Sequence, residues 1–190
     1  MKLKKILPRL FAKTPSKMIK KKDKIFVIIA SYNGLKYWSD LLLFLTQEKY
    51  PDFDLEIVVV DNNSTDGSVE YLQEYWPQVR LIKNETNLGF VGANNVGYHL
   101  ARQEQADYIY LLNQDTVIIP GFLQPLYDFA QKNEFGSLQS KLLLWPQTDK
   151  INTSGNIIHF LGFGYGADSG LVDQKLSEIK KINYASGAGV

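Results

Sequence analysis

Short apolar runs alternate with stretches of helical spacing from residue 24 onward, and this alternation most constrains the fold. Residues 25–30 form an unbroken apolar run, which is typical of a strand buried on both faces of a parallel sheet. Residues 35–49 then have the spacing of a helix, and the pair repeats along the chain. The pattern predicts βαβ units, and therefore an α/β fold with an open, mostly parallel sheet and helices on both faces.

The same alternation places the later elements. It predicts strands at 55–60, 79–83 and 108–112, and helices at 67–76 and 91–103. Pro120 and Gly121 open a further helix through residue 132, because proline suits the first turn, where its missing N–H would be unbonded anyway. We also expect a strand near 137–145 and a glycine-rich hairpin and loop between 152 and 173.

The N-terminal 24 residues differ from the rest in charge. They hold nine Lys, one Arg and one Asp, which leaves 11 basic and 19 acidic residues after them. Apolar residues between Leu3 and Phe11 recur at helical spacing, so residues 1–22 fit an amphipathic helix on an anionic membrane surface. Pro8 and Pro15 restrict such a helix, and a solvated flexible leader fits equally well. We therefore divide the chain into a basic tail, 1–23, and a domain, 24–190.

Composition excludes several classes of protein. A chain of 190 residues with 45% hydrophobic residues buries one core and is too short for two full domains. Cysteine is absent, which excludes disulfides, zinc–thiolate sites and a cysteine nucleophile and weakly favours the cytoplasm. The tail lacks the apolar core of a secretory signal, and no apolar run approaches the roughly 20 residues of a membrane span. The acidic body argues against nucleic acid as a partner. We expect a cytoplasmic protein, with contact to the inner face of the membrane through the tail as the alternative.

Polar clusters follow three of the predicted strands, at residues 31–34, 61–64 and 113–115. Because parallel strands present their carboxyl ends at one edge of a sheet, these clusters should converge there, where open α/β sheets bind ligands. The chain has neither a G-x-G-x-x-G fingerprint after the first strand nor a G-x-x-x-x-G-K-[ST] loop. A Rossmann dehydrogenase and a P-loop enzyme are therefore both unsupported.

The second cluster admits two interpretations. The carboxylate of Asp61 can accept hydrogen bonds from a pyrimidine N–H or a ribose hydroxyl. Alternatively, the residues from Asp61 to Asp66 cap the next helix, since Asp, Asn, Ser and Thr all serve as N-caps. One cap needs only one such residue, so we assign Asp66 with Gly67 to the cap and turn and Asp61 to a ligand. Asn63 stays open between the two.

The third cluster suggests a metal site. Asn113 and Asp115 are two residues apart, so in extended backbone both side chains point to the same side. A hard cation binds through one or two carboxylates together with substrate phosphates, which makes Asp115 the natural ligand. Asn and Asp are also common in turns, so the pair alone is a weak signal.

Four ordered motifs carry a family resemblance: Ile-Ala-Ser-Tyr-Asn at 29–33, Val-Val-Asp-Asn-Asn-Ser-Thr-Asp-Gly at 59–67, Asn-Leu-Gly-Phe-Val-Gly-Ala-Asn-Asn at 87–95 and Leu-Asn-Gln-Asp-Thr at 112–116. Together they resemble the family 2 glycosyltransferases, especially the branch that includes rhamnosyltransferases. The likeness covers about residues 24–190. It implies a GT-A fold and inverting transfer of a hexosyl or rhamnosyl group from a UDP- or dTDP-sugar to a glycan or lipid-linked acceptor. It also implies Mg²⁺ or Mn²⁺ as cofactor and a role in polysaccharide biosynthesis at the cell envelope.

The resemblance also assigns residues. In it, Ser31, Tyr32 and Asp61 line the base and ribose, Asn94 is the strongest candidate of the third motif, and Asp115 meets the metal and diphosphate. Asn113 occupies the first acidic position of the Asp-x-Asp motif and offers only a carbonyl oxygen. The full implied donor site is Ser31, Tyr32, Asn33, Asp61, Asn63, Gly89, Asn94, Asn113 and Asp115, with Asn113 and Asp115 as metal ligands.

The last residues of the sequence predict where the general base lies. Residues 184–188 resemble the segment after which family members continue with the acidic stretch that supplies the general base. We therefore expect the base beyond Val190 and a C-terminally incomplete domain, whose catalytic residues the sequence does not identify. Loss of a general base typically costs about 10²- to 10⁴-fold in rate. The alternative is a non-catalytic nucleotide-sugar-binding or scaffolding remnant that needs a second chain for activity.

Overall fold

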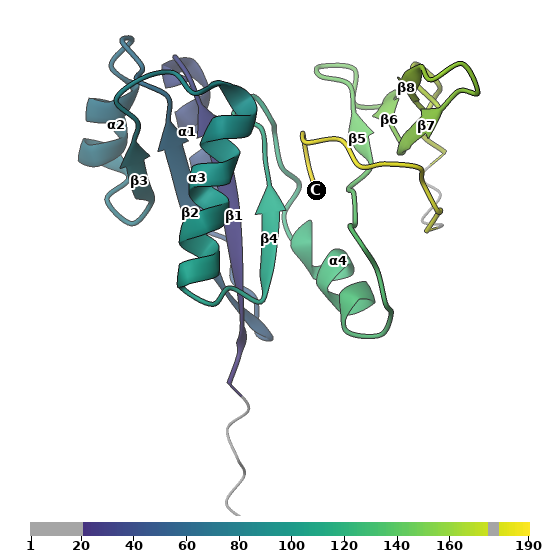
Figure 1. Cartoon of the computed structure of the whole chain (residues 1–190), viewed down its shortest axis with the longest axis horizontal. Helices are drawn as coiled ribbons and strands as arrows, with labels where there is room; N and C mark the ends of the chain where they lie inside the picture. The colour runs from purple at the N-terminus through teal and green to yellow at the C-terminus, as the bar shows by residue number, and fades with distance from the viewer. Residues whose placement is uncertain (1–20, 175–178) are drawn as a thin grey trace, which may run out of the picture.

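A four-stranded parallel sheet, drawn on the left in Figure 1, organises the first part of the chain. The computed structural model describes residues 21–174 and 179–190, so the two interpretations of the basic tail fall largely outside the described residues. The strand order is β3-β2-β1-β4. The strands are β1 (Asp23–Ser31), β2 (Phe53–Asp61), β3 (Arg80–Lys83) and β4 (Tyr108–Leu111). The prediction of an α/β fold with a parallel sheet is confirmed.

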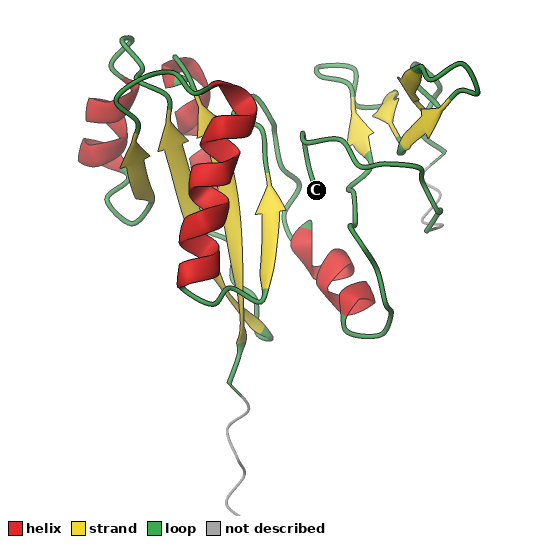
Figure 2. Cartoon of the chain, in the orientation of Figure 1, coloured by secondary structure: helices red, strands yellow, loops and turns green. Residues whose placement is uncertain are grey.

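Helices cover both faces of this sheet (Figure 2). The helices are α1 (Leu35–Leu45), α2 (Ser68–Tyr75), α3 (Gly89–Gln103) and α4 (Leu123–Ala130). Side chains alternate between the faces of a strand, so Val27 of β1 lies in the same core cluster as buried residues of α1, α2 and α4. Its neighbour Ile28 belongs to the cluster that contains Ala93 and Ala101 of α3.

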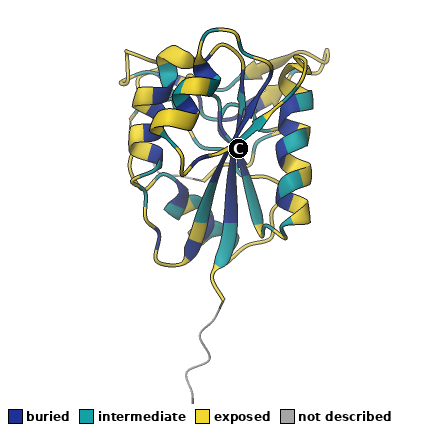
Figure 3. Cartoon of the chain, turned by 90° about the vertical axis from the view of Figure 1, so that its left-hand side faces the viewer, coloured by how far each residue is buried: buried dark blue, intermediate teal, exposed yellow. Residues whose placement is uncertain are grey.

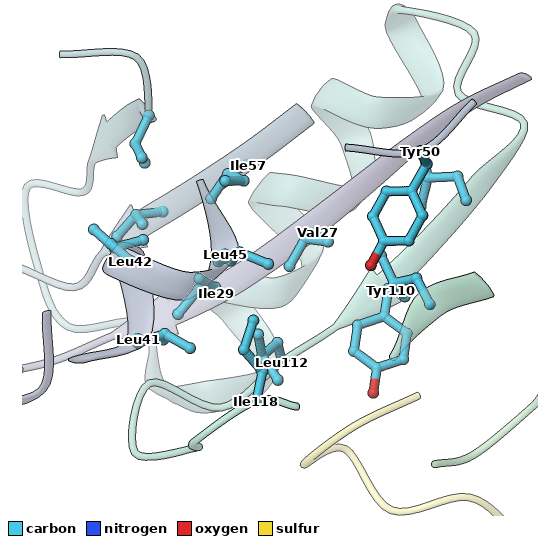
Figure 4. Packing of buried hydrophobic residues seen from close by; sticks show 14 of the residues in the cluster. Val27, Ile29, Leu41, Leu42, Leu45, Tyr50, Ile57, Tyr110, Leu112 and Ile118 are labelled. Atoms are coloured by element: carbon cyan, nitrogen blue, oxygen red, sulfur yellow. The ribbon is translucent and has the colours of Figure 1, made fainter. Parts of the chain in front are cut away.

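The larger core cluster lies between β1 and α1. Figure 4 shows Leu41 and Leu45 of α1 beside Val27 and Ile29 of β1. These side chains are at most 1% exposed, and each buried side chain of this kind contributes roughly 1.5–3 kcal/mol. In Figure 3 burial is concentrated in the central strands, while the outer faces of the helices are exposed. The continuous apolar run of β1 is therefore explained by coverage on both faces.

Two helices are shorter than the sequence pattern suggests. The structure ends α1 at Leu45 rather than at residue 49, and the N–H and the hydroxyl of Thr46 both donate to the carbonyl of Leu42 in the last turn (3.0 and 2.6 Å). Likewise, α4 begins at Leu123 rather than at Pro120. Gly121 has a φ of 77°, a left-handed conformation that a helix cannot contain.

Two small antiparallel pairs follow α4. One joins β5 (Leu142–Leu143) to β6 (Ile151–Thr153), and the other is a hairpin of β7 (Asn156–Ile158) and β8 (Gly164–Gly166). The hairpin confirms the expectation for residues 152–173. The strand expected at 137–145 was wrong in extent, because only β5 forms there and it pairs outside the main sheet. Just before β5, the N–H of Ser140 donates to the carbonyl of Gly189 (3.1 Å), so the backbone there bonds to the C-terminal segment and not to a strand of the main sheet.

The final residues lie antiparallel to β4. The N–H of Val190 donates to the carbonyl of Leu111 (3.1 Å), and the N–H of Asn113 donates to the carbonyl of Ala188 (3.3 Å). Residues 188–190 therefore lie beside the polar end of β4. Among the helices of the described residues, none has the length and apolar character to cross a membrane.

Candidate functional site

A pocket of about 370 Å³ opens at the carboxyl edge of the sheet. The chain builds β1, β2 and β3 in one direction and then places β4 on the other side of β1. The connections that follow β1 and β4 therefore diverge, and such a switch point is where open α/β sheets bind ligands. The lining residues are Ala30, Ser31, Tyr32, Asn62, Asn87, Gly89, Phe90, Asn113, Gln114 and Asp115.

Five of the nine residues expected in the donor site line this pocket. They are Ser31, Tyr32, Gly89, Asn113 and Asp115. The other four, Asn33, Asp61, Asn63 and Asn94, are not among its lining residues.

Asp61 ends β2 directly beside Ser31, its partner in the parallel register. The side chain is buried, and one carboxylate oxygen accepts a hydrogen bond from the backbone N–H of Ser64 (2.9 Å). The other oxygen accepts from the Ser64 hydroxyl (2.5 Å). The carboxylate thus fixes the loop that follows β2, at the carboxyl edge of the sheet where the pocket opens.

Asn33 and Asn63 are loop residues with left-handed backbone, at φ values of 49° and 63°. Asparagine tolerates this region better than most residues do. The N–H of Asn33 donates to the hydroxyl of Ser64 (2.8 Å), and its side-chain oxygen accepts from the N–H of Thr65 (2.9 Å). Asn33 therefore ties the loop after β1 to the loop after β2.

Asn94 lies in α3, and its side chain is 8% exposed. Its amide group donates to the carbonyl of Phe90 one turn earlier (2.9 Å). It lines a second, mostly apolar pocket of about 280 Å³, together with Leu111 and Val190. The structure thus places Asn94 in a different hollow from Tyr32 and Asp115.

Gln114 and Asn62 also line the pocket, although the sequence did not single them out as site residues. The side chain of Gln114 accepts from the N–H of Tyr32 and donates to its carbonyl, both at 3.2 Å. Asn62 donates to the carbonyl of Gly89 (3.1 Å) and accepts from the side chain of Asn84 (2.9 Å). These two amides join the loops that surround the pocket. Both lie inside recognisable motifs, but sequence alone does not tell which loop each one bonds.

Two buried polar atoms at the pocket have no hydrogen-bond partner among the described residues: the hydroxyl oxygen of Ser31 and the side-chain oxygen of Asn113. Leaving such an atom unpaired costs roughly 1–3 kcal/mol. The cost is removed if a bound ligand or ion supplies the partner. A water molecule or the polar group of a ligand in the pocket would supply this partner, so both atoms suit a polar occupant.

The residues at the end of β4 fit a hard cation that is shared with a substrate. Asp115 is exposed and contributes a carboxylate, while Asn113 contributes the unpaired amide oxygen. Mg²⁺ commonly binds through one or two carboxylates plus substrate phosphates. Within residues 21–174 and 179–190, no group of three or more His, Cys, Asp or Glu side chains forms a metal cluster. One carboxylate and one amide oxygen supply only part of a cation's ligands, so this donor set suits a cation that also takes oxygens from a substrate.

Comparison with known proteins identifies the family. The family model described as "Glycosyl transferase family 2" matches residues 26–161. An uncharacterized glycosyltransferase of Haemophilus influenzae is 25% identical over 113 residues, which cover 58% of this chain and 33% of the relative. The poly(ribitol-phosphate) beta-glucosyltransferase of Bacillus spizizenii is 32% identical over 123 residues, which cover 63% of this chain and 19% of the relative. The chain thus spans a third or less of the length of these relatives.

A solved structure of Staphylococcus aureus TarS, residues 1–349, is 27% identical to this chain with a TM-score of 0.49, and the match covers 62% of this chain and 39% of TarS. The family model covers more than two thirds of the sequence and includes most of β1, all of β2 to β4 and every residue that lines the pocket. The chain therefore belongs to glycosyl transferase family 2, and its fold is the GT-A form of the α/β class.

Proposed function

We propose that the pocket binds the donor of a glycosyl transfer, a UDP- or dTDP-sugar, and that the sugar passes with inversion to a glycan or lipid-linked acceptor. The observation that carries the proposal is the polar pocket at the switch point between β1 and β4. Its volume of about 370 Å³ lies within the range of roughly 300–1,000 Å³ that is typical of small-molecule sites.

Each side of the pocket has a role in this proposal. Tyr32 is 48% exposed at the rim, and its ring offers an apolar face to the nucleobase. The unpaired hydroxyl of Ser31 binds the base or ribose. The carboxylate of Asp61 lies beside Ser31 but outside the pocket lining, so it binds the ribose only by exchanging a hydrogen bond with Ser64 for one to the ligand. Gly89 lets the backbone approach the nucleoside closely, because it has no side chain.

Asp115 and Asn113 hold Mg²⁺ or Mn²⁺ together with the diphosphate. The cation, when bound, neutralises the negative charge of the leaving nucleoside diphosphate. The carboxylate of Asp115 fixes the diphosphate end of the donor, while Gln114 keeps the backbone of Tyr32 in place at the other end.

The relatives' names favour a hexose or N-acetylhexosamine as the transferred sugar. Besides the glucosyltransferase above, the Staphylococcus aureus relative TarS is a poly(ribitol-phosphate) beta-N-acetylglucosaminyltransferase, 32% identical over 122 residues. Rhamnosyl transfer is the alternative that the motif resemblance supports. In either case we propose a role in making a cell-envelope polysaccharide, with the domain at 24–190 as the donor-binding part.

Calorimetric titration tests the proposal directly. The purified chain is titrated with UDP, dTDP, GDP and ADP, each with and without Mn²⁺. We expect UDP or dTDP to bind, more tightly with Mn²⁺, and to raise the melting temperature in proportion to ligand concentration. GDP and ADP are the matched controls for general diphosphate binding. Failure of both pyrimidine nucleotides to bind would refute a pyrimidine donor.

A further inference from the structure

The side chain of Gln114 joins two loops that lie on different sides of the pocket. The ladder between β1 and β4 ends at the pair of Ile28 and Leu111. Tyr32 lies beyond it, in the loop after β1, and Gln114 lies in the loop after β4. The amide of Gln114 accepts from the N–H of Tyr32 and donates to its carbonyl, both at 3.2 Å. A side chain therefore continues the bonding between the two strands beyond the point where their backbones stop pairing.

Gly34 leaves the space that this amide occupies. A Cβ atom at position 34 would overlap the side-chain oxygen of Gln114, and it would lie 3.2 Å from the ring of Trp38. The φ of Gly34 is −100°, so its backbone does not itself require glycine. Its N–H donates to the hydroxyl of Ser68 (3.1 Å), a bond that alanine could keep. The close approach of Gln114 therefore explains the glycine at this position.

The neighbours of Gln114 in sequence belong to the other side of the pocket. Asn113 and Asp115, the proposed cation ligands, line the pocket together with Tyr32, which we assign to the nucleobase. The segment that carries the cation ligands is thus bonded through its middle residue to the side that holds the base. A nucleoside diphosphate has its base and its phosphates at opposite ends, so it must contact both sides at once. The spacing of the two sides then determines whether both sets of contacts can form together.

We propose that Gln114 is a positioning residue, which fixes the base side of the donor pocket relative to the cation side. The inference rests on the proposed function. Without the amide, the loop of Tyr32 can move relative to Asp115, and the site is less pre-organised for a ligand that spans it. That loop stays bonded to the loop after β2 through Asn33 and Ser64, and both bonds of Gln114 are exposed to water. Loss of the amide should therefore weaken donor binding without unfolding the chain.

A comparison of a nucleotide with its nucleoside tests this role. The full chain is titrated with UDP and Mn²⁺ by calorimetry and with uridine by NMR; dTDP and thymidine replace them if wild type prefers dTDP. We expect Gln114→Ala to lower UDP affinity roughly tenfold, the factor that corresponds to a net loss of about one to two hydrogen bonds. Uridine contacts only the base side, so its affinity should fall less than about threefold. The melting temperature should stay close to that of wild type.

Gln131→Ala is the matched control. The side chain of Gln131 also makes two amide hydrogen bonds, to Asp23 (3.0 Å) and to the hydroxyl of Tyr108 (3.1 Å). Asp23 is the first residue of β1, at the opposite end of this strand from the pocket. This variant should bind both UDP and uridine like wild type.

Gly34→Ala tests the same contact without changing Gln114. Its added methyl group should displace the amide, so UDP affinity should fall as it does in Gln114→Ala. The double variant should lose no more than Gln114→Ala alone, because the two substitutions act through one contact. Additive losses would contradict a shared contact. If Gly34→Ala does not fold, the comparison of UDP with uridine in Gln114→Ala decides by itself.

Two results for Gln114→Ala would overturn the proposal. Unchanged UDP affinity would show that the two bonds serve only the local structure of the loops. Equal losses of UDP and uridine affinity would show that Gln114 acts on the base side alone and does not set the spacing. A wild type that binds neither UDP nor dTDP would refute the proposed function and this inference with it. Binding by wild type that Gln114→Ala leaves unchanged would refute only the role of Gln114.

Discussion

Asp66 accepts a hydrogen bond from the backbone N–H of Leu35, the first residue of α1, at 2.9 Å. Its other carboxylate oxygen accepts from the N–H and the hydroxyl of Ser68, the first residue of α2. The residues that precede these helices are Gly34 and Gly67, which have no side chain to cap them. One carboxylate therefore caps two helices and holds together the loops that follow β1 and β2.

Replacing Asp66 should destabilise the fold through both helices. We expect Asp66→Ala to lower the free energy of unfolding by about 1–3 kcal/mol, since each N-cap contributes about 1 kcal/mol. Asp66→Asn keeps a side-chain oxygen and should lose less. Urea denaturation measures both values. Equal stability of Asp66→Ala and wild type would show that the cap bonds contribute nothing.

The stabilisation from Asp66 should depend on pH. Burial alone would raise the pKa of this carboxyl, but hydrogen bonds from Ser68 and Leu35 outweigh burial and lower the pKa below its ordinary value of 3.8. A lowered folded-state pKa gives stability that is present above the unfolded value and lost as pH falls through the folded value. The difference in unfolding free energy between wild type and Asp66→Asn should therefore be constant near neutral pH and shrink below about pH 4. A difference that instead grew on acidification would contradict this assignment.

The end of β4 should control metal-linked binding. Asp115→Asn removes the one carboxylate that lines the pocket. It should weaken Mn²⁺-dependent nucleotide binding by at least about tenfold, the loss typical of even an indirect metal partner. Asn113→Asp adds a second carboxylate and should strengthen Mn²⁺ binding. Titration of nucleotide with and without Mn²⁺ measures both, and identical Mn²⁺ dependence in all three proteins would remove the cation from this position.

Two substitutions distinguish a ligand-binding role of Asp61 from its role in holding the loop through Ser64. Asp61→Ala removes both the carboxylate and its two hydrogen bonds with Ser64, whereas Ser64→Ala removes only the hydroxyl bond. If Asp61 binds the base or ribose, Asp61→Ala should weaken nucleotide binding even without Mn²⁺, and Ser64→Ala should weaken it much less. Equal losses in the two variants would mean that Asp61 acts only by shaping its loop.

Gly97 sets the distance between α3 and β1. A Cβ atom at this position would lie 2.5 Å from a methyl carbon of Ile28, inside the smaller core cluster. We expect Gly97→Ala to destabilise by about 1–3 kcal/mol, the usual cost of overpacking. Gly136→Ala is the control, because no atom lies within 4 Å of its added Cβ. Thermal unfolding measures both variants: a melting temperature lowered in Gly97→Ala but not in Gly136→Ala is the expected result, and equal melting temperatures would contradict it.

The sequence by itself determined the parallel sheet, the helices on its two faces and the polar residues at the strand ends. Apolar runs such as residues 25–30 can only be buried, and polar residues that follow a parallel strand must lie at its carboxyl edge. The ends of the helices could not be predicted from the apolar periodicity. It does not contain the left-handed φ of Gly121, which delays the start of α4, nor the end of α1 at Leu45.

Only the tertiary structure decided which of the polar strand ends line the pocket. The chain places β4 beside β1, so Asn113 and Asp115 lie around the same pocket as Ser31 and Tyr32. Asp61 instead pairs with Ser64 in its own loop. The physical reason is that each of these polar side chains can bond either a ligand or a neighbouring loop, and the order of the strands determines which of these partners is within reach.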